Sequence, residues 1–228
     1  MRSKSDFEKQ FERQAPEEVK RKIRVYFLIV CEGSKTEPNY FRAFPSENGE
    51  FTIEQILEGG AGNTRNVVDK AIELRDKSDR KYDRVWAVFD KDSFPDEDFN
   101  AAIQRGEDNG IHCAWSNEAF ELWYLLHFCR REDAMSRTQY KDAISEQVNR
   151  RLGKKAGNYT YKKNDPDNYR LITKLGRQDL AIRYAKELEE KYSNKRFARH
   201  NPRTTVYKLV EELMGQDEEL NKEIAKGL

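Results

Sequence analysis

The sequence predicts an α/β domain with a mostly parallel sheet flanked by helices, followed by a helical C-terminal extension. Between residues 23 and 116, short apolar segments alternate with segments whose apolar residues recur at helical spacing. This alternation is typical of strands and helices in parallel sheets. After residue 116 the strand-like segments cease and helical patterns follow. We therefore divide the chain into a flexible N-terminal arm (1–22), an α/β core (23–116) and a mainly helical part packed on that core (117–228).

Composition narrows the class of protein. The 228 residues are 37% hydrophobic and 36% charged, and the formal net charge is +1. A chain without a strong positive charge can attract nucleic acid only through local clusters of basic residues. No apolar run is long enough to span a bilayer, the charged first residues do not form a signal peptide, and the three cysteines are sparse. These features predict a cytoplasmic protein without a membrane partner.

Each predicted element follows from its residue pattern. Segments rich in β-branched and aromatic residues predict strands at 23–30, 51–57, 84–89 and 111–115. Apolar residues at helical spacing predict helices at 36–44, from 63 or 64 onward, and at 95–109, 118–128, 138–151, 179–192 and 204–214. We expect Thr36 to cap the first of these helices. The remaining segments predict a glycine-rich turn at 59–62, a loop at 153–167 and an acidic tail after 214.

Acidic residues stand where two of the predicted strands end. Glu32 follows the first strand, and Asp90 and Asp92 follow the third. Ligands of open parallel sheets bind at the carboxyl ends of the strands, so we expect these three side chains to converge. In an extended segment, Asp90 and Asp92 would point the same way and Lys91 elsewhere.

Converging carboxylates repel one another, and a divalent cation removes that cost. Ligation by oxygen alone favours Mg²⁺ or Mn²⁺ over zinc. Acidic residues after strands are also common in turns and helix caps. The ordered pair of Glu-Gly after one strand and Asp-x-Asp after another nevertheless favours a metal site with Glu32, Asp90 and Asp92 as its ligands.

Further polar residues fall near this predicted edge of the sheet. Gly33 leaves room for a phosphate, and Glu37 could add a carboxylate to the site or to a second metal. Glu121 lies in an otherwise apolar helix, so it must be paired or must face a site. A catalytic and a structural role for Glu121 remain equally open. For His127 a structural role is favoured, because a zinc site with His112, Cys113 and Cys129 would match no standard spacing.

These motifs resemble a known family. An apolar strand ending in Glu-Gly and a later strand ending in Asp-x-Asp resemble the TOPRIM signature, which implies a TOPRIM-like, Rossmann-like fold. More closely, the segments VCEGSKTEPNYFRAF, VWAVFDKDSF, SNEAFELWYLLHF and NPRTTVYKLV together resemble the RloB-like family. Where that family usually has Pro after Ser-Asn, this chain has Glu118. The resemblance covers residues 22 to 214.

The resemblance implies a nuclease of antiphage defence, encoded beside an ATPase of the SMC-like or overcoming-lysogenization type. It also implies that Glu32 is the TOPRIM glutamate and that Asp90 and Asp92 are the metal pair.

Two stretches, 150–163 and 191–203, are basic, contain no acidic residue and are interleaved with aromatic residues. Basic groups neutralise phosphates and aromatic rings stack on unpaired bases, so these stretches predict a nucleic-acid groove. Taken singly, such charges are usually only solvated. The candidate nucleic-acid-binding residues are Lys35, Arg65, Lys154, Lys155, Lys162, Lys163, Arg196 and Arg199.

The sequence thus predicts Mg²⁺- or Mn²⁺-dependent hydrolysis of DNA or RNA, with Glu32, Asp90, Asp92 and Glu121 as the catalytic residues. Two alternatives remain. One is a non-catalytic subunit that senses nucleic acid or binds a partner ATPase. The other is nucleotidyl transfer, as in primases, which use the same carboxylates but carry a zinc-binding module that this sequence lacks.

Overall fold

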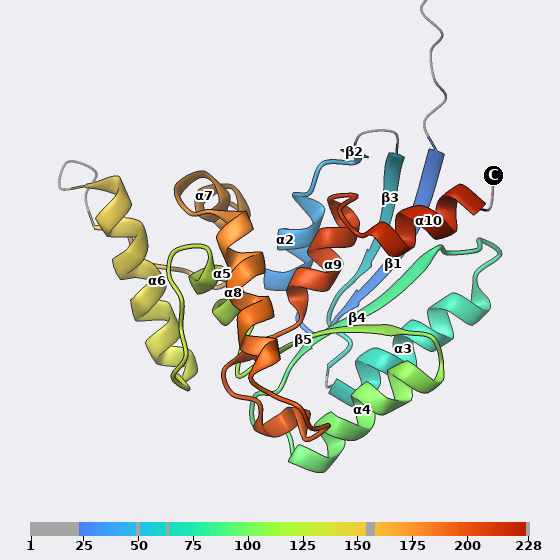
Figure 1. The fold of residues 1–228 in the computed structure, drawn as a ribbon, viewed down its shortest axis with the longest axis horizontal. Coiled ribbons are helices and arrows are strands. Elements are labelled where there is room, and N and C mark those ends of the chain that lie inside the picture. The colour runs from blue at the N-terminus through green and yellow to red at the C-terminus, as the bar shows by residue number, and fades with distance from the viewer. Residues whose placement is uncertain (1–22, 49–50, 63, 154–157, 227–228) are drawn as a thin grey trace, which may run out of the picture.

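A computed structural model of the chain describes residues 23–48, 51–62, 64–153 and 158–226 (Figure 1). The predicted N-terminal arm lies outside these ranges. The described part forms a six-stranded sheet in the order β2-β3-β1-β4-β5-β6. Its strands are β1 (Ile23–Cys31), β2 (Glu47–Asn48), β3 (Phe51–Glu58), β4 (Arg84–Asp90), β5 (His112–Asn117) and β6 (Arg203–Thr204).

The four longer strands, β3, β1, β4 and β5, are parallel to one another. The two short edge strands, β2 and β6, run antiparallel to β3 and β5. The predicted mostly parallel sheet is therefore confirmed. β1 is central, and residues Phe27 to Cys31 are fully buried because both faces of the sheet are covered.

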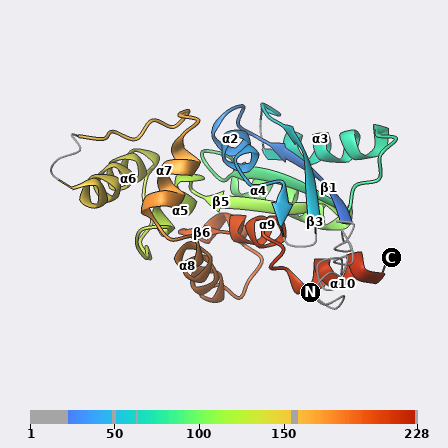
Figure 2. The same ribbon diagram turned by 90° about the horizontal axis from the view of Figure 1, so that it is seen from above.

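Helices lie on both sides of the sheet (Figure 2). Alternate side chains of the strands belong to two different clusters, one with each set of helices. Leu28 and Val30 face the helices α3 (Thr64–Lys77) and α4 (Asp96–Asp108). Phe27 and Ile29 face the opposite way, into the larger cluster, which includes residues of α2 (Thr36–Arg42), α5 (Glu121–Leu126) and α9 (Val206–Leu213). The two clusters follow the twofold period of strand side chains.

The chain leaves neighbouring strands toward opposite faces of the sheet. After β1 it enters α2, whose Tyr40 and Phe41 belong to the larger cluster, and after β4 it enters α4, whose Phe99 belongs to the other. β1 and β4 are paired from Phe27 to Cys31. The carboxyl ends of these two strands are therefore the place where open α/β sheets bind their ligands.

The C-terminal part is mainly helical but also contributes β6 to the sheet. It contains α5, α6 (Arg137–Leu152), α7 (Asn168–Leu175), α8 (Gln178–Glu190), the short 3-10 helix η2 (Phe197–Arg199), α9 and α10 (Glu218–Lys226). Figures 1 and 2 both place α6 and α10 at opposite ends of the molecule. In the described ranges, no helix has both the length and the hydropathy needed to cross a bilayer.

Some element boundaries differ from the predicted ones. Thr36 begins α2 but does not cap it, because its hydroxyl donates to the carbonyl of Lys163 at 3.0 Å. The expected acidic tail contains α10, whose first turn is held by Asp217 accepting from the backbone N–H of Leu220 at 2.7 Å. Helix α9 starts at Val206 rather than 204, because residues 203 and 204 pair with β5. The peptide bond between Asn117 and Glu118 is cis.

His127 follows α5 and is 1% exposed. Its Nδ1 lies 2.9 Å from the carbonyl oxygen of Trp123, and its ring packs edge-on against the indole of the same residue. Burial lowers the pKa of His127 to about 4. The imidazole is therefore neutral in the folded protein at physiological pH and serves the core, as the sequence favoured.

We predict that His127→Asn flattens the acid dependence of stability. The unfolded chain protonates His127 near pH 6.5 but the folded chain only near pH 4, so stability is full above pH 6.5 and is lost as the pH falls toward 4. At about 1.4 kcal/mol per pKa unit, this histidine accounts for about 3 kcal/mol of that loss. Urea unfolding of wild type and variant from pH 7.5 to 4.5 measures the two slopes, and parallel slopes would contradict the prediction.

Candidate functional site

Glu32 and Asp90 meet at the carboxyl ends of β1 and β4. Glu32 is the first residue after β1, and its backbone N–H donates to the carbonyl of Val88 at 2.9 Å, which continues the pairing with β4. Its Oε2 accepts from the backbone N–H of Asp90 at 3.1 Å. The parallel arrangement of two neighbouring strands thus brings together acids that lie 58 residues apart in the chain.

Asp92 reaches the same place by a turn rather than by strand alternation. β4 ends at Asp90, and Asp92 has a φ of 41°, so the extended backbone that the sequence argument assumed is absent there. The backbone N–H groups of Lys91 and Asp92 donate to the carbonyls of Ser116 (2.9 Å) and Glu118 (3.2 Å). These bonds fix the turn. Lys91 itself points away and pairs with Asp96 at 3.3 Å.

A guanidinium group joins the two aspartates. Nη2 of Arg137, at the start of α6, lies 3.5 Å from Oδ2 of Asp90 and 3.1 Å from Oδ2 of Asp92. Arg137 was not among the residues that the sequence singled out. The sequence around Arg137 gives no sign of this contact, because Asp90 lies 47 residues earlier in the chain and no local pattern in α6 points to it.

Two buried glutamates also act on the charge of Asp90. Glu37 of α2 is 3% exposed and Glu121 of α5 is 1% exposed. Burial raises the pKa of Asp90 well above its ordinary value, and the carboxylates of Glu37 and Glu121 raise it further. Burial likewise raises the pKa of Glu37, with Glu121 adding to the shift. Glu121, the fourth acid that the sequence singled out, is thus near enough to Asp90 to act on its charge.

Neither buried glutamate is fully satisfied by hydrogen bonds. Oε1 of Glu121 accepts from the hydroxyl of Tyr161 at 3.4 Å, whereas its Oε2 is buried without a partner, as is Oε2 of Glu37. Gly33 makes room for this arrangement, because a Cβ there would collide with the carboxylate of Glu37. A buried acceptor without a donor is costly, so these oxygens indicate a place for a ligand that the protein itself does not supply.

Glu32 is more accessible than these three acids. It is half-buried, and burial raises its pKa to about 6, with Glu37 also raising it and the bond from the Asp90 backbone opposing the shift. A carboxyl group with a pKa near 6 is well placed to exchange protons near neutral pH.

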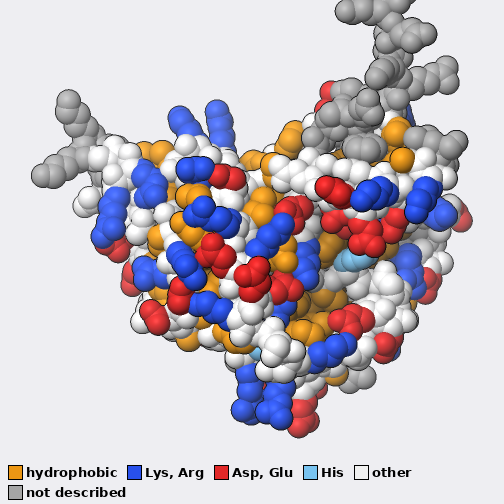
Figure 3. Space-filling view, in the orientation of Figure 1, with side chains coloured by type: hydrophobic (Ala, Val, Ile, Leu, Met, Phe, Trp, Pro, Cys, Tyr) orange, Lys and Arg blue, Asp and Glu red, His pale blue; other side chains and the backbone are white. Residues whose placement is uncertain are grey.

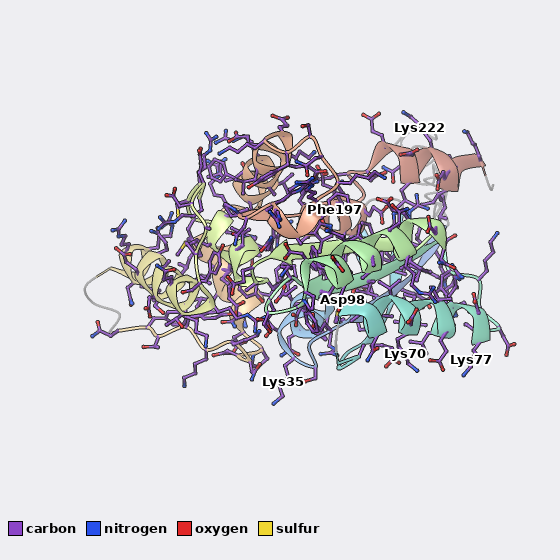
Figure 4. The ribbon with its side chains drawn as sticks, turned by 90° about the horizontal axis from the view of Figure 1, so that it is seen from below. Lys35, Lys70, Lys77, Asp98, Phe197 and Lys222 are labelled. Carbon is purple, nitrogen blue, oxygen red and sulfur yellow. The ribbon has the colours of Figure 1, made fainter. Side chains whose placement is uncertain are left out.

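Of the basic residues that the sequence singled out for nucleic-acid binding, three lie in the region of α2 and the acids. Lys163 lies close enough to the acids to lower the pKa of both Glu37 and Asp90, and its carbonyl is bound by Thr36. Lys162 is exposed beside it. Lys35 is exposed at the start of α2, and Figure 4 shows it pointing outward along the same edge as Lys70 and Lys77 of α3.

The other candidate nucleic-acid-binding residues either lie near η2 or belong to parts of the chain that the structure does not describe. Arg196 and Arg199 are exposed near η2, and Arg199 pairs with Asp96 at the start of α4 at 3.3 Å. Arg65 belongs to α3, but its side chain is outside the described part of the structure, and Lys154 and Lys155 lie outside the described residues altogether. On the face seen in Figure 3, cationic and acidic side chains are interspersed, as expected for a net charge of +1.

Comparison with known proteins gives one result. The model of a family described as RloB-like protein matches residues 27–213. The chain belongs to the RloB-like family. The matched segment runs from within β1 to the end of α9 and contains Glu32, Glu37, Asp90, Asp92, Glu121, Arg137 and Lys163. Neither the search of curated proteins nor that of solved structures found a match.

As the side chains lie, no three His, Cys, Asp or Glu residues in the described ranges of this RloB-like chain are arranged to hold a metal ion. The Arg137 guanidinium stands between Asp90 and Asp92 instead. The donor set nevertheless suits a hard divalent cation. It consists of carboxylates, and two of their oxygens are buried without a partner.

We predict that Glu121→Gln stabilises the metal-free protein. The amide retains an acceptor for Tyr161 but removes one of the charges that repel Asp90 and Glu37. A gain of about 1 kcal/mol would raise Tm by roughly 3 °C in EDTA. Thermal unfolding measures it, with Glu97→Gln on the exposed face of α4 as the matched control. A lower Tm for Glu121→Gln alone would show instead that this charge supports the fold.

Proposed function

We propose that this RloB-like chain is a Mg²⁺- or Mn²⁺-dependent nuclease that hydrolyses phosphodiester bonds. The observation that carries the proposal is the gathering of Glu32, Asp90 and Asp92 at the carboxyl ends of β1 and β4, beside the unsatisfied carboxylates of Glu37 and Glu121. Acids are not collected in this way to stabilise a fold, because each adds repulsion and desolvation cost.

In this proposal Glu32, Asp90 and Asp92 hold the cation, and Glu37 and Glu121 add negative charge behind them. A bound Mg²⁺ or Mn²⁺ supplies Lewis acidity toward the phosphate and lowers the pKa of a water molecule. Glu32 is more accessible than Asp90, so among these ligands it is the one placed to pass a proton to or from the reacting groups. Because Asp90 is nearly inaccessible to solvent, we assign it to holding the cation and not to proton transfer.

Lys162 and Lys163 are neighbours in the segment that contacts the start of α2, where Thr36 binds the carbonyl of Lys163. The charge of Lys163 also acts on Asp90. We propose that they bind the backbone of the nucleic-acid strand, with Lys35 on the same rim and Arg65, Lys154, Lys155, Arg196 and Arg199 extending the contact. Contacts to phosphate carry no information about the base sequence. The family resemblance further supports RNA, including tRNA, as a substrate, a cytoplasmic role in antiphage defence, and a partner ATPase.

One observation favours a second function. Arg137 already offsets part of the negative charge of Asp90 and Asp92, so their repulsion is reduced without a metal. A chain that used them only in this way would be a nucleic-acid-binding or regulatory subunit of a defence complex. It would bind nucleic acid with the same basic residues but cleave nothing.

We predict that Asp90→Asn abolishes cleavage. The amide is isosteric but cannot supply the charge that a hard cation needs, so the rate should fall at least about a hundredfold, equivalent to ~2.7 kcal/mol in the barrier. Labelled RNA and DNA incubated with Mg²⁺ or Mn²⁺ provide the assay. Asp98→Asn, at an exposed position of α4 labelled in Figure 4, is the matched control. Equal cleavage by wild type and Asp90→Asn would disprove the catalytic assignment, and binding without cleavage by wild type would support the regulatory alternative.

We also predict that Lys163→Ala weakens binding of a single-stranded oligonucleotide about equally for different sequences. Loss of one phosphate contact should reduce the slope of log affinity against log salt by about 0.7. Fluorescence anisotropy at several salt concentrations measures the slope. Lys222→Ala, on α10 at the opposite edge of the molecule in Figure 4, should leave it unchanged. An unchanged slope for Lys163→Ala would place the strand elsewhere.

A further inference from the structure

Arg137 occupies a position that α6 itself does not favour. It is the first residue of α6, after a Ser136 cap whose side chain accepts from the backbone N–H of Gln139 at 3.4 Å. The first turn contains no acidic residue. A cation at a helix N-terminus is opposed by the helix dipole, so the favourable partners of Arg137 must come from elsewhere. They are Asp90 and Asp92.

The contact between Arg137 and the aspartates is not a fully formed ion pair. One nitrogen, Nη2, serves both carboxylates, at 3.1 and 3.5 Å, and the buried Nε has no hydrogen-bond partner. Strong guanidinium–carboxylate pairs use two parallel hydrogen bonds. The side chain of Arg137 is also 37% exposed, so it can leave the aspartates without crossing the core.

The acids that surround this contact outnumber the bases. Lys163 also acts on Asp90, and Glu37 and Glu121 oppose it from α2 and α5. Replacing a single positive charge by a divalent ion would therefore improve the balance of charge at the same carboxylates. It would also release a guanidinium beside the site at which the proposed function places a phosphate.

We propose that Arg137 exchanges partners: it bridges Asp90 and Asp92 in the metal-free protein, and a divalent cation displaces it onto a phosphate of the nucleic-acid strand. The inference rests on the proposed function, which supplies the cation and the strand. Arg137 is then both a competitor of the metal and a substrate-binding residue. The planar, always charged guanidinium suits both carboxylate and phosphate oxygens, so the exchange keeps its hydrogen bonds.

Two opposite effects of Arg137→Ala test the exchange. Removing the competitor should tighten Mn²⁺ binding, measured by calorimetry, by roughly fivefold or more. Removing the phosphate partner should weaken binding of a short single-stranded oligonucleotide in Ca²⁺ by roughly tenfold. Arg137→Lys should restore part of the oligonucleotide affinity, since it keeps the charge but not the fork. Arg183→Ala, which removes an exposed ion pair on α8, should change neither quantity.

Thermal unfolding shows whether a change in binding by Arg137→Ala comes only from a less stable fold. In EDTA, Arg137→Ala should unfold at a lower temperature than wild type, and saturating Mn²⁺ should close that gap. Unchanged or weaker Mn²⁺ binding by a folded Arg137→Ala would overturn the exchange even if wild type cleaves nucleic acid. Tighter Mn²⁺ binding without any cleavage by wild type would sustain the exchange at the metal and overturn the nuclease. A wild type that binds no Mn²⁺ would overturn both.

Discussion

The carboxylates of Glu37, Asp90 and Glu121 are buried within range of one another's charge. Their mutual repulsion is the constraint that the surrounding side chains must offset. It raises the pKa of Asp90 beyond the effect of burial alone. It also explains why cations approach from two separate elements, Arg137 from α6 and Lys163 from the segment before α7. The helical part of the chain is thereby tied to the sheet by charge as well as by its apolar core.

The part of this arrangement that follows from local pattern could be predicted from the sequence. Apolar segments ending at Glu32 and Asp90 predict parallel strands, and parallel neighbours must end at the same edge of a sheet. The bond from the backbone of Asp90 to Glu32 follows from that topology. Glu121 was recognisable for a different reason, because a charged residue within an apolar helix needs a specific environment.

Features that depend on distant contacts or on turn geometry could not be predicted in this way. Asp92 meets Asp90 through a backbone with positive φ, which is uncommon for aspartate and is fixed by the carbonyl of Glu118. The sequence suggested that Thr36 caps a helix, but its hydroxyl donates to the carbonyl of Lys163, 127 residues further along the chain. Arg137 follows an ordinary helix cap, and only the folded chain brings it to the aspartates.

Stability alone does not account for the unsatisfied oxygens of Glu37 and Glu121. A glutamine at either position would keep the shape of the side chain, add a hydrogen-bond donor and remove a charge, which should lower the electrostatic cost of folding. The chain instead buries both carboxylates, and glycine at position 33 leaves the space that Glu37 fills. Such a departure from the stable solution is expected where a site must bind a ligand of opposite charge. The loosely held guanidinium of Arg137 fits the same logic, because a group that must be displaced cannot also be the strongest partner of the acids it neutralises.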